Sequence, residues 1–182
     1  GDYAARNGFE YVFKIDDDVY GFTGRYGARS NEQRAREKLQ LALTEIEHAL
    51  DTNPLLGAVG FPYHNELYEE KTWGNVNSRL QTCYVIRTRF VPLPPDAFEW
   101  SDFAHTLRVR GAGFATIRYG AAMNCCPVGG TSGGAQDFNR KRLAEASREA
   151  FMRLWPGLQW KTTTHAWGIE PDFRRTKGLG NG

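Results

Sequence analysis

The sequence has 182 residues, a length that suits one domain with one hydrophobic core. Hydrophobic residues make up 41% of the chain and aromatic residues 13%, which excludes disordered, collagen-like and coiled-coil classes. The net charge of +2 is too small to identify a partner. No apolar run is long enough to cross a membrane, and residues 1–10 lack a signal-peptide pattern. Three cysteines, two of them adjacent, fit a reducing compartment, so we expect a cytoplasmic protein without a membrane partner.

The first half of the chain predicts a strand, a loop, a helix and a second strand. Residues 9–15 (FEYVFKI) are rich in β-forming side chains and end in three aspartates. The glycine-rich stretch 21–30 is predicted to be a loop. Ser30 and Gln33 form a capping box that opens a helix, which Asn53-Pro54 ends. The apolar positions of this helix recur at helical spacing, at Leu39, Leu43, Ile46 and Leu50.

The rest of the chain continues the alternation of strands and helices, which predicts an α/β fold with a mixed sheet flanked by helices. We expect a single domain over residues 1–182, with a frayed tail at 178–182. The predicted elements are strands over 55–61, 82–88 and 114–119, a helix over 102–110, a flexible loop over 129–134, and a long helix before Pro156.

The long C-terminal helix is predicted to be amphipathic. We expect Trp155, Trp160 and Trp167 to pack it against the sheet. Its apolar side is predicted to carry Phe138, Leu143, Ala146, Ala150 and Leu154. Its basic residues are Arg140, Lys141, Arg142, Arg148 and Arg153. Such basic residues either bind a polyanion or form a helix face that is simply exposed to solvent.

The aspartate triplet Asp16, Asp17 and Asp18 directly follows the first predicted strand. Three adjacent carboxylates repel one another unless a cation compensates their charge. Oxygen ligands without neighbouring histidine or cysteine suit a hard ion such as Mg²⁺ or Mn²⁺, which usually also binds substrate phosphates. The pattern therefore predicts a metal-bound diphosphate site, and the alternative is a solvated acidic turn.

The segment from Tyr11 to Val19 resembles the DxD segment of GT-A glycosyltransferases. The resemblance implies that Asp16 and Asp18 bind Mn²⁺ or Mg²⁺, which bridges the diphosphate of a nucleotide sugar. Asp17 stands at the middle position of the motif and is assigned to the nucleotide-sugar site. His165 is the candidate for a further metal ligand supplied from late in the chain, as in some GT-A enzymes, and the alternative is a surface or capping histidine.

A second segment, from Trp100 to Gly111 (WSDFAHTLRVRG), is similar to the W-E-D-x-D-x-T-L motif of the same family. The resemblance implies that Asp102 is the catalytic base. Ser101 and Ala104 depart from the motif, where glutamate and aspartate are usual. Asp102 also suits a helix N-cap. His105 lies one turn further along the predicted helix, where it either assists acceptor binding or is a buried structural histidine.

The third segment is Gly129-Gly130-Thr131-Ser132, followed by the basic helix. Backbone amides in such a loop before a helix suit phosphate contacts, and we assign these four residues to the nucleotide-sugar site. With the other two segments, it resembles the TET/JBP-associated glycosyltransferases of phages and of organisms that make glucosylated thymine bases. The resemblance implies transfer of a hexose, from UDP-glucose or a similar donor, to a 5-hydroxymethylpyrimidine in DNA, in the host cytoplasm if phage-encoded.

Members of the GT-A family usually place their first nucleotide-binding strands before the DxD strand. Only about fifteen residues precede Asp16 here, so we expect a fragment or a shortened variant that lacks part of the N-terminal half. Three further functions stay open. The first is a glycosyltransferase acting on a protein or glycan, and the second is a catalytically silent module that binds nucleotide sugars or DNA. The third is a metal-dependent phosphoesterase or nuclease.

Overall fold

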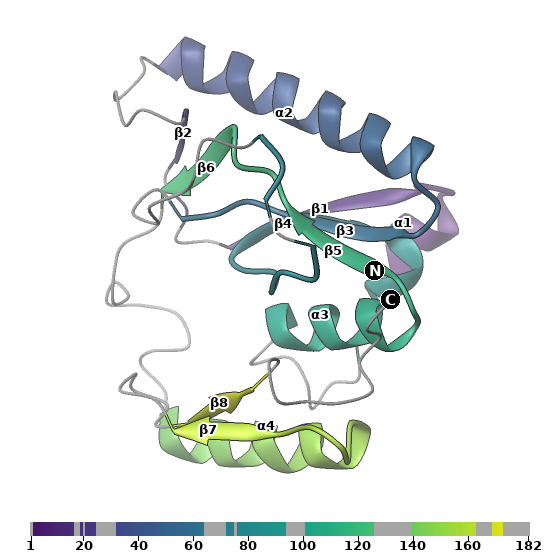
Figure 1. The fold of residues 1–182 in the computed structure, drawn as a ribbon, viewed down its shortest axis with the longest axis vertical. Coiled ribbons are helices and arrows are strands. Elements are labelled where there is room, and N and C mark those ends of the chain that lie inside the picture. Colours follow the sequence, from purple (N-terminus) through teal and green to yellow (C-terminus); the bar gives the residue numbers. More distant parts are fainter. Residues whose placement is uncertain are drawn as a thin grey trace.

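The structure is a computed structural model that describes residues 2–16, 19, 21–24, 32–63, 72–74, 76–93, 101–125, 140–162 and 169–172. Its centre is a mixed sheet with the strand order β1-β4-β3-β5, which lies between helix α2 on one face and helix α3 on the other (Figure 1). The helices are α1 (Asp2–Arg6), α2 (Glu32–Thr52), α3 (Ser101–Gly111) and α4 (Arg140–Leu154), and a 3-10 turn covers Thr88–Phe90. The strands are β1 (Tyr11–Ile15), β2 (Gly21–Gly24), β3 (Leu56–Gly60), β4 (Cys83–Arg87), β5 (Ala115–Arg118), β6 (Ala122–Cys125), β7 (Trp160–Thr162) and β8 (Ile169–Pro171).

The predicted α/β class is confirmed. Strand β4 pairs antiparallel with both β1 and β3, whereas β3 and β5 run parallel. The four predicted sheet strands and the helix over 102–110 appear within two residues of their predicted ends. The described part of α2 begins at Glu32, so the capping box at Ser30 lies outside the described residues.

The α2 face of the sheet forms the larger core. Ile46 and Leu50 of α2 are fully buried and pack with Val59 and Phe61 from the β3 region. Burial at four-residue intervals is expected of a helix that covers a sheet with one stripe. The opposite face of the sheet packs against Val109 of α3.

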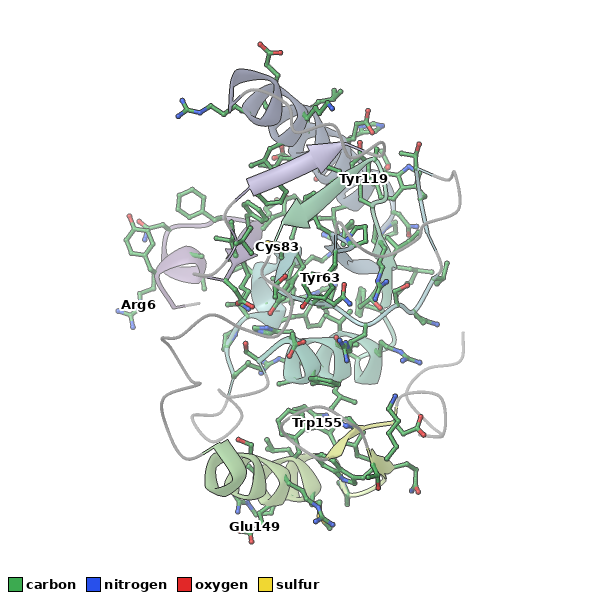
Figure 2. All side chains as sticks on the ribbon, turned by 90° about the vertical axis from the view of Figure 1, so that its left-hand side faces the viewer. Arg6, Tyr63, Cys83, Tyr119, Glu149 and Trp155 are labelled. Atoms are coloured by element: carbon green, nitrogen blue, oxygen red, sulfur yellow. The ribbon has the colours of Figure 1, made fainter. Side chains whose placement is uncertain are left out.

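Helix α4 and strands β7 and β8 form a further layer beneath α3 (Figure 1). Phe103 and Leu107 of α3 are buried together with Phe151 of α4, and Trp155 and Trp160 pack on this cluster. Figure 2 shows Trp155 on the side of α4 that faces α3. The expectation that these two tryptophans pack α4 against the sheet is therefore wrong, because α3 is apolar on two sides and separates α4 from the sheet.

The apolar side of α4 also differs from the prediction at one position. Leu154 is 40% exposed, whereas Ala150 and Phe151 are buried. The buried stripe of α4 therefore runs through Phe151 and not through Leu154. Leu154 is the last residue of the helix, after which the chain leads to β7. Side chains 138, 143 and 146 and Trp167 lie outside what the structure describes.

Two short ribbons were not predicted. Strands β2 and β6 pair antiparallel, as do β7 and β8. Residues 21–24 (GFTG) were predicted as loop because glycine disfavours strands, and their pairing with residues 122–125 depends on tertiary contacts. In the described ranges, no helix combines the length and the apolar composition that a membrane span requires.

Candidate functional site

Asp16 lies directly after the last residue of β1. Its backbone N–H donates to the carbonyl oxygen of Thr82 at 3.1 Å, which extends the ladder between β1 and β4 by one residue. The N–H of Val19 donates to the Asp16 carbonyl oxygen at 3.3 Å, so the chain turns at this point. The Asp16 side chain is 33% exposed and accepts a charge-assisted hydrogen bond from Lys14. The first aspartate of the triplet is thus held at the strand end and remains open to solvent.

Lys14 and Tyr84 are cross-strand neighbours. They are register partners in the antiparallel pair of β1 and β4, and the Lys14 Nζ atom lies 5.4 Å from the centroid of the Tyr84 ring. Because side chains alternate along a strand, Lys14 and Asp16 project from the same face of the sheet. This face is the one covered by α3, where Tyr84 is buried in the cluster that includes Val109.

The buried hydroxyl of Tyr84 connects β4 to α3. It lies 2.6 Å from Nδ1 of His105, and Nε2 of His105 lies 3.0 Å from the carbonyl oxygen of Val91. A carbonyl can only accept, so we assign the histidine proton to Nε2, and Nδ1 then accepts the hydrogen of Tyr84. Burial lowers the pKa of His105 to about 4, which keeps the ring neutral. Of the two roles considered for His105, this geometry matches the buried structural one.

Asp102 lies in the first turn of α3. Its Oδ1 accepts from the N–H of Phe103 at 2.8 Å, and its carbonyl oxygen accepts from the Thr106 hydroxyl at 2.7 Å. The same hydroxyl accepts from the N–H of Leu80 at 3.0 Å, which ties this turn to the chain before β4. The helix begins at Ser101, so Asp102 is not the N-cap residue that its position in the sequence suggested.

Asp16 and Asp102 both act electrostatically on the hydroxyl of Tyr84. Burial is the main cause that raises the pKa of Tyr84 above its ordinary value of 10, and the negative charges of Asp102 and then Asp16 raise it further. A hydrogen bond with the Ser101 side chain acts in the opposite direction. Two carboxylates that are 86 positions apart in the sequence (102 minus 16) therefore lie within electrostatic reach of one hydroxyl group.

The donor chemistry at Asp16 suits a hard cation. Cys83, which is labelled in Figure 2, is fully buried, and burial followed by the charge of Asp16 raises its pKa to about 12. Its thiol is protonated at neutral pH and supplies no soft ligand, so the described donor is a carboxylate that fits Mg²⁺ or Mn²⁺. In the described portion of the chain, no three His, Cys, Asp or Glu side chains form a metal-sized group. Asp17, Asp18 and His165 lie outside that portion.

The ribbon of β2 and β6 relates two of the predicted motifs. Gly21 at the start of β2 lies opposite Cys125 at the end of β6. In the sequence, the aspartate triplet precedes β2 and the Gly129–Ser132 segment follows β6. Residues 129–132 themselves are outside the described ranges, and their assignment to a nucleotide-sugar site stays a prediction.

A separate cavity of about 340 Å³ lies between α3 and α4, and it does not include the two carboxylates. It follows the later turns of α3, whereas Asp102 occupies the first turn. Arg108 at its edge donates a hydrogen bond to the carbonyl oxygen of Pro92. The lining residues are Leu93, Leu107, Arg108, Gly111, Leu154 and Trp155.

The basic residues of α4 are described only near its C-terminal end. Arg148 and Arg153 are exposed, and the Arg148 guanidinium lies 5.9 Å from the centroid of a Trp160 ring. The side chains at 140–142 lie outside the described set.

Sequence reasoning missed two members of the site, Lys14 and Tyr84. Lys14 could have been found, because its position two residues before Asp16 places it on the same strand face. Tyr84 could not, since its role depends on the register between β1 and β4 and on the docking of α3.

Comparisons with protein-family models, with curated proteins and with solved structures give no match for this chain.

Proposed function

We propose that this chain is a metal-dependent glycosyltransferase of the GT-A type, acting on DNA. The reaction would transfer a hexose from a nucleotide sugar such as UDP-glucose to the hydroxyl of a 5-hydroxymethylpyrimidine. The observation that supports the proposal is that, beyond burial, the charges of Asp102 and Asp16 both raise the pKa of Tyr84. Asp16 and Asp102 are the first acid of the DxD-like segment and the acid of the second motif, and the proposed chemistry needs them in one site.

The two carboxylates have different tasks in this proposal. Asp102 would accept the proton of the acceptor hydroxyl. The hydroxyl oxygen would attack the anomeric carbon of the sugar as the bond from that carbon to the diphosphate breaks. Asp16, together with Asp18, would hold Mn²⁺ or Mg²⁺, which offsets the negative charge of the leaving nucleoside diphosphate. Asp102 suits its task because hydrogen bonds to Phe103 and Thr106 fix the first turn of α3.

The acceptor is supported by the charge of α4. Exposed arginines such as Arg148 and Arg153 can approach DNA phosphates and release counterions. A base inside a duplex must leave the stack before its hydroxymethyl group can reach Asp102, and the energetic cost of this extrusion is a few kcal/mol.

The direct test incubates the protein with Mn²⁺, a panel of UDP-sugars and hydroxymethylated duplex DNA, and measures glycosylated nucleosides by mass spectrometry. We expect one hexose to appear on the modified base. The Asp102→Asn variant should lower the rate on the order of a hundredfold or more, because it cannot accept the proton. Asp51→Asn makes the same chemical change at an exposed position at the end of α2 and should leave the rate unchanged.

Two outcomes would contradict the proposal. If no donor supports transfer, the assigned activity is wrong. If the Asp102→Asn variant transfers sugar at an undiminished rate, Asp102 is not the catalytic base. Hydrolysis of a UDP-sugar without modification of the DNA would retain a sugar transferase but require a protein or glycan acceptor.

A further inference from the structure

Lys14 forms an ion pair with Asp16, the predicted metal ligand. Its ammonium group pairs with Oδ1 of Asp16, and the two side chains are 25% and 33% exposed. The Lys14 Nζ atom also lies over the buried ring of Tyr84, 5.4 Å from its centroid. The ion pair and the ring contact together hold the ammonium group of Lys14 beside Asp16.

This ion pair conflicts with a divalent cation. A carboxylate that binds Mg²⁺ or Mn²⁺ has less negative charge to offer Lys14, and the ammonium group and the metal ion repel each other. In the absence of other ligands, Lys14 and the metal therefore compete for Asp16. A diphosphate removes the conflict, since its oxygens can contact a metal ion and an ammonium group at the same time.

We propose that Lys14 is a donor-binding residue that exchanges Asp16 for the diphosphate of the nucleotide sugar when the metal ion binds. This inference rests on the proposed function and adds a residue that the sequence motifs do not contain. It has a specific consequence: Lys14 weakens the binding of metal alone and strengthens the binding of nucleotide in the presence of metal. The two ligands are thereby coupled through a single side chain.

The test compares two affinities in the Lys14→Gln variant by isothermal titration calorimetry. The affinity for Mn²⁺ alone should rise by several-fold, because the competing ammonium group is absent. The affinity for UDP at saturating Mn²⁺ should fall by roughly tenfold or more, because a charge-assisted hydrogen bond to phosphate is lost. Lys14→Arg retains the charge and should restore most of the UDP affinity.

Lys38→Gln is the matched control, since Lys38 is an exposed lysine of α2. It makes the same chemical change and should alter neither affinity. Thermal melting followed by circular dichroism shows whether each variant is folded before the titrations are compared.

A higher affinity for Mn²⁺ alone together with a lower affinity for UDP supports the role of Lys14. Loss of a residue that only stabilises the fold would lower both affinities or neither. Wild-type binding of UDP that requires Mn²⁺, together with unchanged affinities in Lys14→Gln, would overturn this inference and leave the proposed function intact. If the wild-type protein binds neither Mn²⁺ nor UDP with Mn²⁺, the proposed function and the role of Lys14 are both overturned.

Discussion

Replacement of Tyr84 by phenylalanine tests whether the hydrogen bond between β4 and α3 holds the first turn of α3 in place. The substitution keeps the aromatic ring, whose centroid lies 5.6 Å from that of His105, and removes only the hydroxyl group. Tyr84 is fully buried and His105 is 6% exposed, so water cannot take the place of the missing donor.

The expected loss of stability follows from what remains after the substitution. Nδ1 of His105 becomes a buried acceptor without its tyrosine partner, while Nε2 still faces the Val91 carbonyl. A buried polar group that loses its partner costs about 1–3 kcal/mol. We therefore expect the free energy of unfolding to fall by about 2 kcal/mol.

The assay is urea denaturation followed by circular dichroism, with Tyr11→Phe as the control. The Tyr11 hydroxyl also donates a hydrogen bond, but its acceptor Asp51 is exposed and water can replace it. Tyr11→Phe should therefore lower the free energy of unfolding by less than about 1 kcal/mol. If Tyr84→Phe costs no more than Tyr11→Phe, the Tyr84–His105 hydrogen bond does not stabilise the fold and the reasoning fails.

Three further predictions address pH, packing and charge. Folding lowers the pKa of His105 from 6.5 to about 4, so below pH 6.5 the unfolded chain binds a proton that the folded chain does not. Stability should therefore fall by about 3 kcal/mol between pH 6.5 and 4, and urea titrations should show a smaller loss in His105→Asn. A Cβ atom at Gly57 would lie 2.5 Å from Val109, so Gly57→Ala should destabilise by about 1–3 kcal/mol in thermal melts. Gly60→Ala, whose nearest contact would be 3.5 Å, should cost less. Replacing Arg148 and Arg153 by glutamine should reduce the slope of DNA affinity against salt concentration, measured by fluorescence anisotropy. An unchanged slope would show that these arginines are solvated and do not contact DNA.

Much of the fold could be predicted from the sequence, because local periodicity carries the information. The β-branched and aromatic runs before Asp16 and over 82–88 gave the sheet strands, and the four-residue spacing through Ile46 and Leu50 gave α2. Alternation of these elements gave the α/β class. Each of these signals lies within a short window of sequence.

The ribbons and the position of α4 depended on tertiary structure. Gly21–Gly24 has little strand propensity of its own and becomes a strand because residues 122–125 lie beside it. The apolar face of α4 indicated that it packs, but periodicity does not say against which partner. Its partner is α3, since Phe103 and Leu107 present a second apolar side away from the sheet.

The candidate site divides in the same way. The sequence by itself identified Asp16 and Asp102 as separate candidates, from the acidic triplet and from the second motif. It could not relate them to one group, because their common effect on Tyr84 requires the register of β1 with β4 and the docking of α3 on the buried tyrosine hydroxyl. Residue types are a local property of the chain, whereas the distance between two carboxylates far apart in sequence is determined only when the strands pair and the helices pack.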